Sequence, residues 1–327
     1  MTRQLVARHE SWPLAQVFRI SRGSKTAADV IVVTIGEDGV EGRGEAVPYP
    51  RYGQTIESSL AEIAAVRRAV EEGASRHELI AQMAPGAARN ALDCALWDLE
   101  AKMTGTPVWR LAGLDEPGDL VTAYTLSLDE PAAMGEAAAR NAHRALLKIK
   151  LDGERVLERL EAVRAGAPKA RLVVDANEAW SIGLLAEIGG ALAALGVERI
   201  EQPLPAAADG ALAGIDCPGV LCADESCHGS DTVAQLADRY GMVNIKLDKT
   251  GGLTEALALR EAALAAGLQV MVGCMVGTSL AMAPAMLVAQ GARVVDLDGP
   301  LLMKADRVPG IAFDGNIMHP APCELWG

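Results

Sequence analysis

The segment Leu146-Leu-Lys-Ile-Lys150 opens the series of short apolar runs that decides the fold. Each run closes on polar residues and is followed by a stretch in which apolar residues recur at helical spacing. The later runs are Leu172–Asp175, Val197–Glu201, Val220–Asp224, Val243–Lys246, Val270–Gly273 and Val294–Asp296. Their last residues are 25, 26, 23, 22, 27 and 23 positions apart, about the length of one strand, one helix and two short loops.

With Val121–Leu126 as an earlier strand, the series contains eight strands. Eight β/α units close into a barrel, whose catalytic residues sit where the strands end. An open, doubly wound sheet would carry a glycine-rich phosphate loop at its first turn, and this sequence has none there. We therefore predict an α/β fold, a (β/α)7β modified TIM barrel over residues 119–300.

The N-terminal third follows a different pattern. Val30–Ile35 is expected to be a strand, Glu37–Gly39 a turn and Gly42–Ala46 the returning strand of an antiparallel meander. Helical spacing follows in the stretches Ile56–Glu72, His77–Met83 and Ala87–Lys102. These features predict an α+β capping domain over residues 1–118, and residues 301–327, which lack the β/α rhythm, are expected to pack back on it.

Composition limits the class of partner. The net charge of −13 argues against nucleic acid, because nucleic-acid binding uses clustered Lys and Arg. No run approaches the eighteen or so apolar residues of a membrane-spanning helix, and Met1–Glu10 lacks the apolar core of a signal peptide. Six cysteines in 327 residues suggest reduced thiols rather than a disulfide framework. We expect a cytoplasmic protein that binds neither nucleic acid nor membrane, with assembly into a homo-oligomer left open.

Asp175, Glu201 and Asp224 end three consecutive runs, so their carboxylates should lie side by side at the barrel mouth. Near 4 Å, each like-charge pair costs on the order of 4 kcal/mol at an effective dielectric of 20, and a divalent cation relieves that repulsion. Oxygen ligands favour Mg²⁺, with Mn²⁺ as the alternative, over zinc or copper. A single acid after a strand is as often a helix cap, but three in succession favour a metal site. Asn177 and Glu225 are expected to support these ligands.

Lys148 and Lys150 are two positions apart on one strand, so both should face the barrel interior. Lys246 ends the sixth strand and should reach the mouth from across the barrel. A lysine is a competent base only when its pKa falls toward about 7–8, as partial burial and a nearby cation can cause. We predict that Lys150 and Lys246 exchange a proton α to a carboxylate, while Mg²⁺ and Lys148 stabilise the enediolate. Two bases on opposite faces invert the carbon centre.

Further segments carry a resemblance to a known family. They are Asn90-Ala-Leu-Asp-Cys-Ala-Leu-Trp-Asp-Leu99, Leu147-Lys-Ile-Lys150, Val174-Asp-Ala-Asn-Glu178, Glu201-Gln-Pro-Leu204, Cys222-Ala-Asp-Glu-Ser226, Asn244-Ile-Lys-Leu-Asp-Lys-Thr-Gly-Gly252, Gly273-Cys-Met275 and Asp296-Leu-Asp-Gly-Pro300. In them the chain resembles the muconate-lactonising branch of the enolase superfamily, and within it the L-Ala-D/L-Glu epimerases. Lysine bases with Mg²⁺ are a pattern of that superfamily. The resemblance implies a dipeptide epimerase that inverts the α-carbon of the C-terminal residue of L-Ala-L-Glu or L-Ala-D-Glu, in murein peptide recycling.

The resemblance also implies how the ends of the substrate are held. It assigns Asp296 and Asp298 to the free α-ammonium of the dipeptide, through charge-assisted hydrogen bonds that an N-acyl amino acid could not make. A charged turn that caps a helix is the simpler alternative for this pair. Cys274 and Met275, after the seventh strand, are expected to line the pocket.

The loop Arg19–Lys25 is expected to fold over the barrel mouth, where Arg22 or Lys25 would pair with a distal carboxylate of the substrate. Solvated surface cations are an equally good interpretation of either residue alone. Tyr52, in the segment Pro48–Tyr52, is expected to be a second lid contact.

Two other functions stay open at this stage. The same fold and metal could serve an N-acylamino-acid racemase, an o-succinylbenzoate synthase or a cycloisomerase, which the Asp296 and Asp298 pair disfavours. A catalytically inactive barrel that only binds a ligand would be expected to lack a base or a metal ligand, and every one of them is present.

Overall fold

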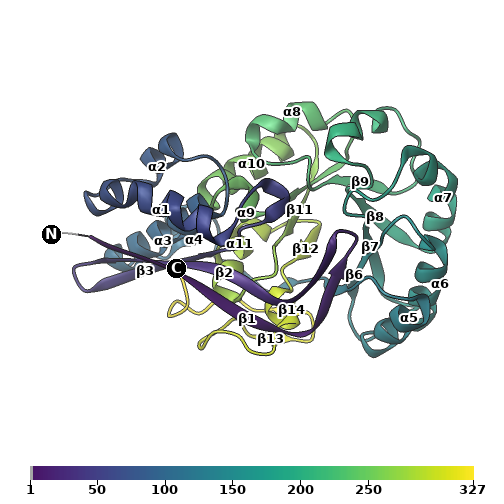
Figure 1. Ribbon diagram of the computed structural model, residues 1–327, viewed down its shortest axis with the longest axis horizontal. Coiled ribbons are helices and arrows are strands. Elements are labelled where there is room, and N and C mark those ends of the chain that lie inside the picture. The colour runs from purple at the N-terminus through teal and green to yellow at the C-terminus, as the bar shows by residue number, and fades with distance from the viewer. Residues whose placement is uncertain (1–2) are drawn as a thin grey trace.

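The computed structural model describes residues 3–327 and contains a barrel of parallel strands (Figure 1). Its strands are β5 (Tyr124–Leu126), β6 (Leu146–Lys150), β7 (Arg171–Asp175), β8 (Val197–Glu201), β9 (Val220–Ala223), β10 (Met242–Ile245), β11 (Gln269–Gly273) and β12 (Val294–Asp296). They are hydrogen-bonded in chain order, and a parallel bridge between Thr122 and Val295 joins the two ends. The predicted barrel is confirmed, and the last residue of every predicted barrel strand lies within one residue of the observed last residue.

Helices surround the barrel, but the segments on both sides of β9 depart from the predicted pattern, and the one after β9 contains only the single α-helical turn Val233–Leu236. They are α5 (Pro131–Arg140), α6 (Val156–Gly166), α7 (Ile182–Ala194), α8 (Val233–Leu236), α9 (Leu247–Thr250), α10 (Leu253–Ala265) and α11 (Ser279–Ala289), with the 3-10 turns η3 (Ser230–Thr232) and η4 (Gly299–Leu302). Between β8 and β9 the prediction of an amphipathic α-helix was wrong, because that segment forms the 3-10 helix η2 (Ala206–Leu212). Six of the eighteen residues from 202 to 219 are Pro or Gly, which disfavour helix interiors.

The interior of the barrel is apolar at one end and polar at the other. Its apolar end is a core cluster of Ala123, Leu146, Val173, Cys222, Met242, Met271 and Val294. Residues two apart on a strand share a face, so Lys148 and Lys150 point to the same side as Leu146. Strand alternation thus places the polar side chains directly above an apolar floor.

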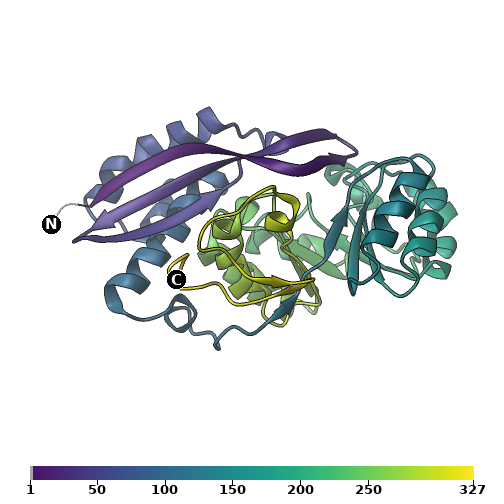
Figure 2. The same ribbon diagram turned by 90° about the horizontal axis from the view of Figure 1, so that it is seen from below.

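The N-terminal module combines an antiparallel sheet with helices. The sheet has the order β1 (Gln4–Ile20), β2 (Gly23–Glu37) and β3 (Val40–Ala46), followed by η1 (Pro50–Tyr52), α1 (Ile56–Glu71), α2 (Arg76–Gln82), α3 (Ala87–Thr104) and α4 (Val108–Leu111). The predicted strand Val30–Ile35 covers most of the buried residues of β2, which also include Ala28. The predicted loop Arg19–Lys25 was wrong, because pairing of β1 with β2 leaves only Ser21 and Arg22 at a hairpin tip. Figure 2 shows this hairpin extending from its own module toward the barrel.

The C-terminal segment contacts both parts of the chain. β14 (Ile317–Met318) pairs with β13 (Phe313–Asp314) and with β4 (Leu120–Val121). The predicted strand Val121–Leu126 is therefore divided between this small sheet and the barrel. Val108 N–H donates to the Gly327 carbonyl at 3.1 Å, next to α4. Domain boundaries at residues 118 and 300 stay a prediction, and within residues 3–327 no helix is long and apolar enough to cross a membrane.

Candidate active site

Three acidic side chains meet at the ends of neighbouring strands. Asp175 and Glu201 are the last residues of β7 and β8, and Asp224 directly follows β9. All three are at most 1% exposed. One ligand oxygen from each lies within 4.8 Å of the oxygens from the other two. The structure thus brings together the residues predicted to hold a metal.

The donor set fits a cation that prefers oxygen. Burial, and then the charge of Asp175, raise the pKa of Glu201 to about 7, as expected for negative charge crowded away from water. Glu201 Oε2 is buried without a hydrogen-bond donor, and its 2.8 Å contact with Lys148 Nζ is an ion pair that lacks hydrogen-bond geometry. Three buried carboxylates with no nitrogen or sulfur ligand among them suit Mg²⁺ or Mn²⁺.

Lys148 lies inside this cluster of charges. Its Nζ is 2.6 Å from Asp296 Oδ2, 2.8 Å from Glu201 Oε2 and 3.3 Å from Asp175 Oδ2. Burial alone would lower the pKa of Lys148, but the carboxylates outweigh it and raise that pKa well above the ordinary lysine value. Lys148 is therefore a fixed positive charge rather than a base.

Lys150 and Lys246 flank the acids from opposite sides. β6 and β10 are four strands apart in the eight-stranded barrel, with β7, β8 and β9 between them. Lys150 Nζ lies 2.6 Å from Asp175 Oδ2, and Lys246 Nζ lies 2.6 Å from Asp224 Oδ2. Burial favours a neutral Lys246, yet the nearby carboxylates raise its pKa well above the ordinary value, opposite in direction to the lowering expected for a base. In this arrangement Lys246 is an ammonium, the form that donates a proton.

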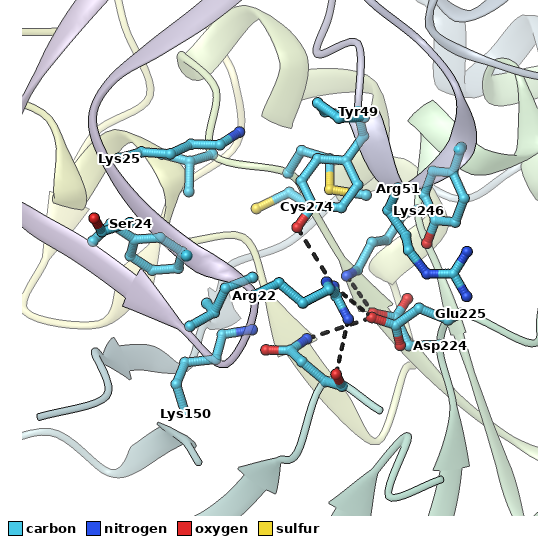
Figure 3. Close-up of a pocket in the computed structure, with 18 residues that line it drawn as sticks. Arg22, Ser24, Lys25, Tyr49, Arg51, Lys150, Asp224, Glu225, Lys246 and Cys274 are labelled. Atoms are coloured by element: carbon cyan, nitrogen blue, oxygen red, sulfur yellow. Dashed lines mark hydrogen bonds and ion pairs between the residues drawn. The ribbon is translucent and has the colours of Figure 1, made fainter. Parts of the chain in front are cut away.

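A cavity of about 420 Å³ opens above these groups (Figure 3). Its size suits a small molecule. The barrel, the β1–β2 hairpin and the segment after β3 all contribute to it, through Lys150, Asn177, Asp224, Glu225, Lys246, Cys274, Met275, Val276, Phe18, Ile20, Arg22, Gly23, Ser24, Lys25, Tyr49, Pro50, Arg51 and Tyr52. Both flanking lysines therefore face the same space.

The hairpin tip is attached to the barrel through Arg22. Its guanidinium lies 2.7 Å from Glu225 Oε1 and donates to the Asn177 carbonyl at 2.9 Å. Lys25 takes a different position, with Nζ 5.1 Å from the centre of the Tyr49 ring. Figure 3 shows Arg22 extending toward Glu225 while Lys25 lies on the far side of the cavity.

Asp296 and Asp298 are buried and are not among the residues that line the cavity. Asp296 ends β12 and pairs with Lys148, while Asp298 Oδ2 accepts the Thr125 N–H at 2.7 Å. Burial and the neighbouring Asp296 raise the pKa of Asp298 to about 7. Asp296 Oδ1 is buried without a hydrogen-bond partner, so one oxygen of the pair is still available to a donor.

Two residues that matter to the site, Asn244 and Lys249, received no role from the sequence. Asn244 Nδ2 donates to Glu201 Oε1 at 2.8 Å, and Lys249 Nζ donates to Asp224 Oδ1 at 2.6 Å. Asn244 stands two positions before Lys246 on β10, so strand alternation could have placed it inside the barrel. Lys249 lies in the turn of helix that follows, and no periodicity marks it.

Comparison with known protein families shows the family of this chain. Residues 2–113 match the N-terminal domain of mandelate racemase and muconate lactonizing enzyme, and residues 132–302 match the "Enolase C-terminal domain-like" family. The chain belongs to the mandelate racemase and muconate lactonizing enzyme family of the enolase superfamily. The resemblance seen in the sequence is thereby confirmed.

Similar members of this family have named activities. L-Ala-D/L-Glu epimerase of Escherichia coli is 46% identical over 95% of this chain and 97% of its own. N-acetyl-D-glutamate racemase of a Pseudoalteromonas species is also 46% identical, over 91% of this chain and 95% of its own.

Solved structures of this enolase superfamily share the fold closely. An Agrobacterium tumefaciens member with homology to dipeptide epimerases, solved with sodium and L-Ala-L-Glu, is 52% identical, covers 99% of this chain and 100% of its own, and has a TM-score of 0.98. A dipeptide epimerase of Enterococcus faecalis, complexed with Mg and L-Leu-L-Tyr, is 27% identical with a TM-score of 0.90, over 98% of this chain and 97% of its own.

Proposed function

We propose that this protein is a Mg²⁺-dependent dipeptide epimerase of the L-Ala-D/L-Glu type. The observation that carries the proposal is the position of Lys150 and Lys246, at the ends of opposite barrel strands yet lining one cavity beside three acids. A carbon held between them can lose its proton to one lysine and receive a proton from the other. The two similar enzymes at 46% identity, which are named for acting on glutamate-containing substrates, support the same chemistry.

The lysines must alternate their protonation states. In each direction a neutral amine removes the α-proton of the C-terminal residue, and the opposite ammonium returns one to the other face. Because the reverse reaction exchanges these roles, both lysines serve as acid and as base. Lys148 is placed to stabilise the charge that moves onto the substrate carboxylate, since its ammonium is fixed among the buried acids.

Asp175, Glu201 and Asp224 are the residues proposed to hold Mg²⁺. When bound there, Mg²⁺ supplies positive charge that stabilises a substrate carboxylate as it gains electron density. Asn177 supports this set, because its N–H donates to Asp175 Oδ1 at 2.9 Å. Glu225 supports the cavity in another way, through its ion pair with Arg22.

The ends of the dipeptide are assigned to two groups of residues. We propose that Asp296 and Asp298 receive the α-ammonium, which would then compete with Lys148 for Asp296. At the other end, Arg22 and Lys25 both line the cavity, and we propose that one of them meets the distal carboxylate. Cys274, Met275 and Tyr52 line the intervening wall.

A second candidate is an N-acetylglutamate racemase. It is favoured by the 46% identity to the Pseudoalteromonas enzyme, which equals the identity to the dipeptide epimerase. The two candidates differ in the group on the substrate nitrogen: an ammonium can pair with Asp296 and Asp298, whereas a neutral acetamide cannot, and leaves Lys148 as the counter-charge of Asp296.

A cellular role accompanies the first candidate. Recycling of murein peptides in the cytoplasm would supply the dipeptide, and the acidic composition without clustered cations is consistent with a small-molecule enzyme there. A soluble homo-oligomer is compatible with this role.

Proton NMR in deuterium oxide tests the function directly. With Mg²⁺, we expect L-Ala-L-Glu to lose the α-proton signal of its glutamate and to yield the second diastereomer. N-acetyl-D-glutamate at the same concentration is expected to exchange at least tenfold more slowly, about 1.4 kcal/mol in barrier. Faster reaction of the N-acetyl compound would favour the second candidate, and no exchange of either substrate would overturn the proposal.

The lysine variants separate the two half-reactions. Lys150→Ala and Lys246→Ala should each abolish epimerisation, because one proton carrier is missing. Each variant should still exchange the α-proton of one epimer only, the epimer whose proton faces the remaining lysine. If either variant exchanges both epimers equally, the two-sided assignment is wrong. Lys169→Ala, at an exposed position, is the control.

A further inference from the structure

One oxygen of each metal-binding acid is already occupied by a donor from the protein. Asp175 Oδ1 accepts the backbone N–H of Asn177 at 2.9 Å, Glu201 Oε1 accepts Asn244 Nδ2 at 2.8 Å, and Asp224 Oδ1 accepts Lys249 Nζ at 2.6 Å. The second oxygen of each acid instead contacts a lysine of the site. The same division recurs on three strands with three chemically different donors.

Within residues 3–327, every hydrogen bond of the Lys249 side chain goes to Asp224 or Asn244. Its side chain is 0% exposed, and Nζ also donates to the carbonyls of Asp224 at 2.5 Å and Asn244 at 3.0 Å. An ammonium has three donors, and all three are used within this group. Lys249 therefore cannot reach a substrate, and its role is to fix the Asp224 carboxylate.

Asn244 is held in place by the space beside it. A Cβ built on Gly273 of the adjacent strand β11 would lie 2.7 Å from Asn244 Oδ1 and 2.9 Å from Nδ2, so only glycine leaves room for this amide. Asn244 is 0% exposed, and within the described part of the chain its side chain makes one hydrogen bond, to Glu201. The amide thus fixes which oxygen of Glu201 turns inward.

The consequence concerns which cation the site selects. Mg²⁺ requires near-octahedral geometry at 2.0–2.1 Å and few protein ligands, whereas Ca²⁺ accepts 6–8 oxygens and often binds a carboxylate through both. We propose that Asn244 and Lys249 are positioning residues that restrict Glu201 and Asp224 to one inward oxygen each and so make the site select Mg²⁺ over Ca²⁺. This inference rests on the metal site of the proposed function.

Isothermal titration of the EDTA-treated full chain with MgCl₂ or CaCl₂ alone tests it. Asn244→Leu removes the donor with little change in volume or charge, and we expect the ratio of the Ca²⁺ Kd to the Mg²⁺ Kd to fall about tenfold, the lower end of the effect of losing such a partner. Lys249→Met should lower the same ratio. Loss of the Lys249 charge should strengthen the binding of Mg²⁺ and Ca²⁺ alike, because both are divalent cations. The ratio of the two Kd values is therefore the readout. Lys249→Gln keeps an amide donor and should recover part of the ratio.

Controls distinguish the possible failures. Lys169→Met removes an exposed lysine and the same charge, and its ratio should equal that of the unchanged protein. Thermal unfolding in EDTA checks that each variant folds. If Lys249→Met does not fold, Asn244→Leu alone is sufficient for the test. Suppose that the unchanged protein binds Mg²⁺ and epimerises its substrate. If folded Asn244→Leu then has a ratio of the Ca²⁺ Kd to the Mg²⁺ Kd within twofold of that of the unchanged protein, only this inference is overturned. If the unchanged protein does not bind Mg²⁺, the metal assignment is overturned as well.

Discussion

At the scale of the residue, Asp248 carries a buried charge that the chemistry does not use. Its Oδ1 accepts the Val47 N–H and Asn90 Nδ2, both at 2.9 Å. Burial raises the pKa of Asp248 to about 6 from an ordinary value near 3.8. The folded state therefore binds the proton more tightly, and the stability from this group is complete below about pH 3.8 and is lost as the pH rises through 6.

The variant Asp248→Asn should remove that loss. An asparagine keeps the acceptor for Val47 and Asn90 but carries no charge. We expect the free energy of unfolding of Asp248→Asn minus that of the unchanged protein to increase by up to about 3 kcal/mol from pH 4 to pH 7. Urea unfolding at several pH values measures it, with exposed Asp314→Asn as the control. A difference that does not vary with pH would contradict the prediction.

At the scale of the element, Glu178 adds a second attachment of the β1–β2 hairpin to the one that Arg22 makes with Glu225 and the Asn177 carbonyl. Glu178 accepts Arg51 through both oxygens, at 2.6 and 2.7 Å, and lies 3.4 Å from Arg22 at the hairpin tip. Its Oε1 also accepts the Ala206 N–H at 2.9 Å. One carboxylate therefore connects the hairpin, η1 and the barrel.

Glu178→Ala should loosen the tip. Charge-assisted hydrogen bonds contribute about 1.5–3 kcal/mol, so trypsin should cleave after Arg22 or Lys25 at a rate at least tenfold higher. Time-resolved mass spectrometry of the digest measures this rate. Glu158→Ala breaks an exposed ion pair between α6 and Arg155, which directly precedes that helix, and should leave the rate unchanged. Equal cleavage in both variants would mean that Glu178 does not hold the hairpin.

Elements also show what the sequence could and could not predict. The barrel strands were predictable because a buried parallel strand is a short apolar run with a polar end. β1 was not, since in this edge strand residues such as Val6 and Val17 are exposed and only Leu5 and Leu14 are buried. Likewise, the acids and lysines follow from strand ends, but the roles of Asn244 and Lys249 depend on side-chain contacts between elements, which no spacing encodes.

At the scale of the whole molecule, one buried ionic group joins the N-terminal sheet, the barrel and the C-terminal segment. Glu45 of β3 is 1% exposed and accepts the N–H of Thr278, the N-cap of α11, at 2.7 Å. Its other oxygen pairs with Arg307 at 2.5 Å, and Arg307 also reaches Glu10 of β1 at 2.8 Å. Burial raises the pKa of Glu45 even against Arg307, so its charge depends on that partner.

Removing one partner should therefore destabilise the molecule as a unit. Arg307→Met leaves the Glu45 carboxylate without its counter-charge, and we expect a loss of about 3–5 kcal/mol in the free energy of unfolding. The double variant Arg307→Met with Glu45→Gln should recover much of that loss, because a neutral amide still accepts the Thr278 N–H. Urea unfolding followed by tryptophan fluorescence and by far-ultraviolet circular dichroism should give coincident transitions for both variants. Tryptophan fluorescence can detect separate unfolding of the two parts, because Trp12 lies in β1 and Trp180 lies in the barrel domain. Two separate transitions in the single variant would contradict the expectation that the molecule unfolds as one unit.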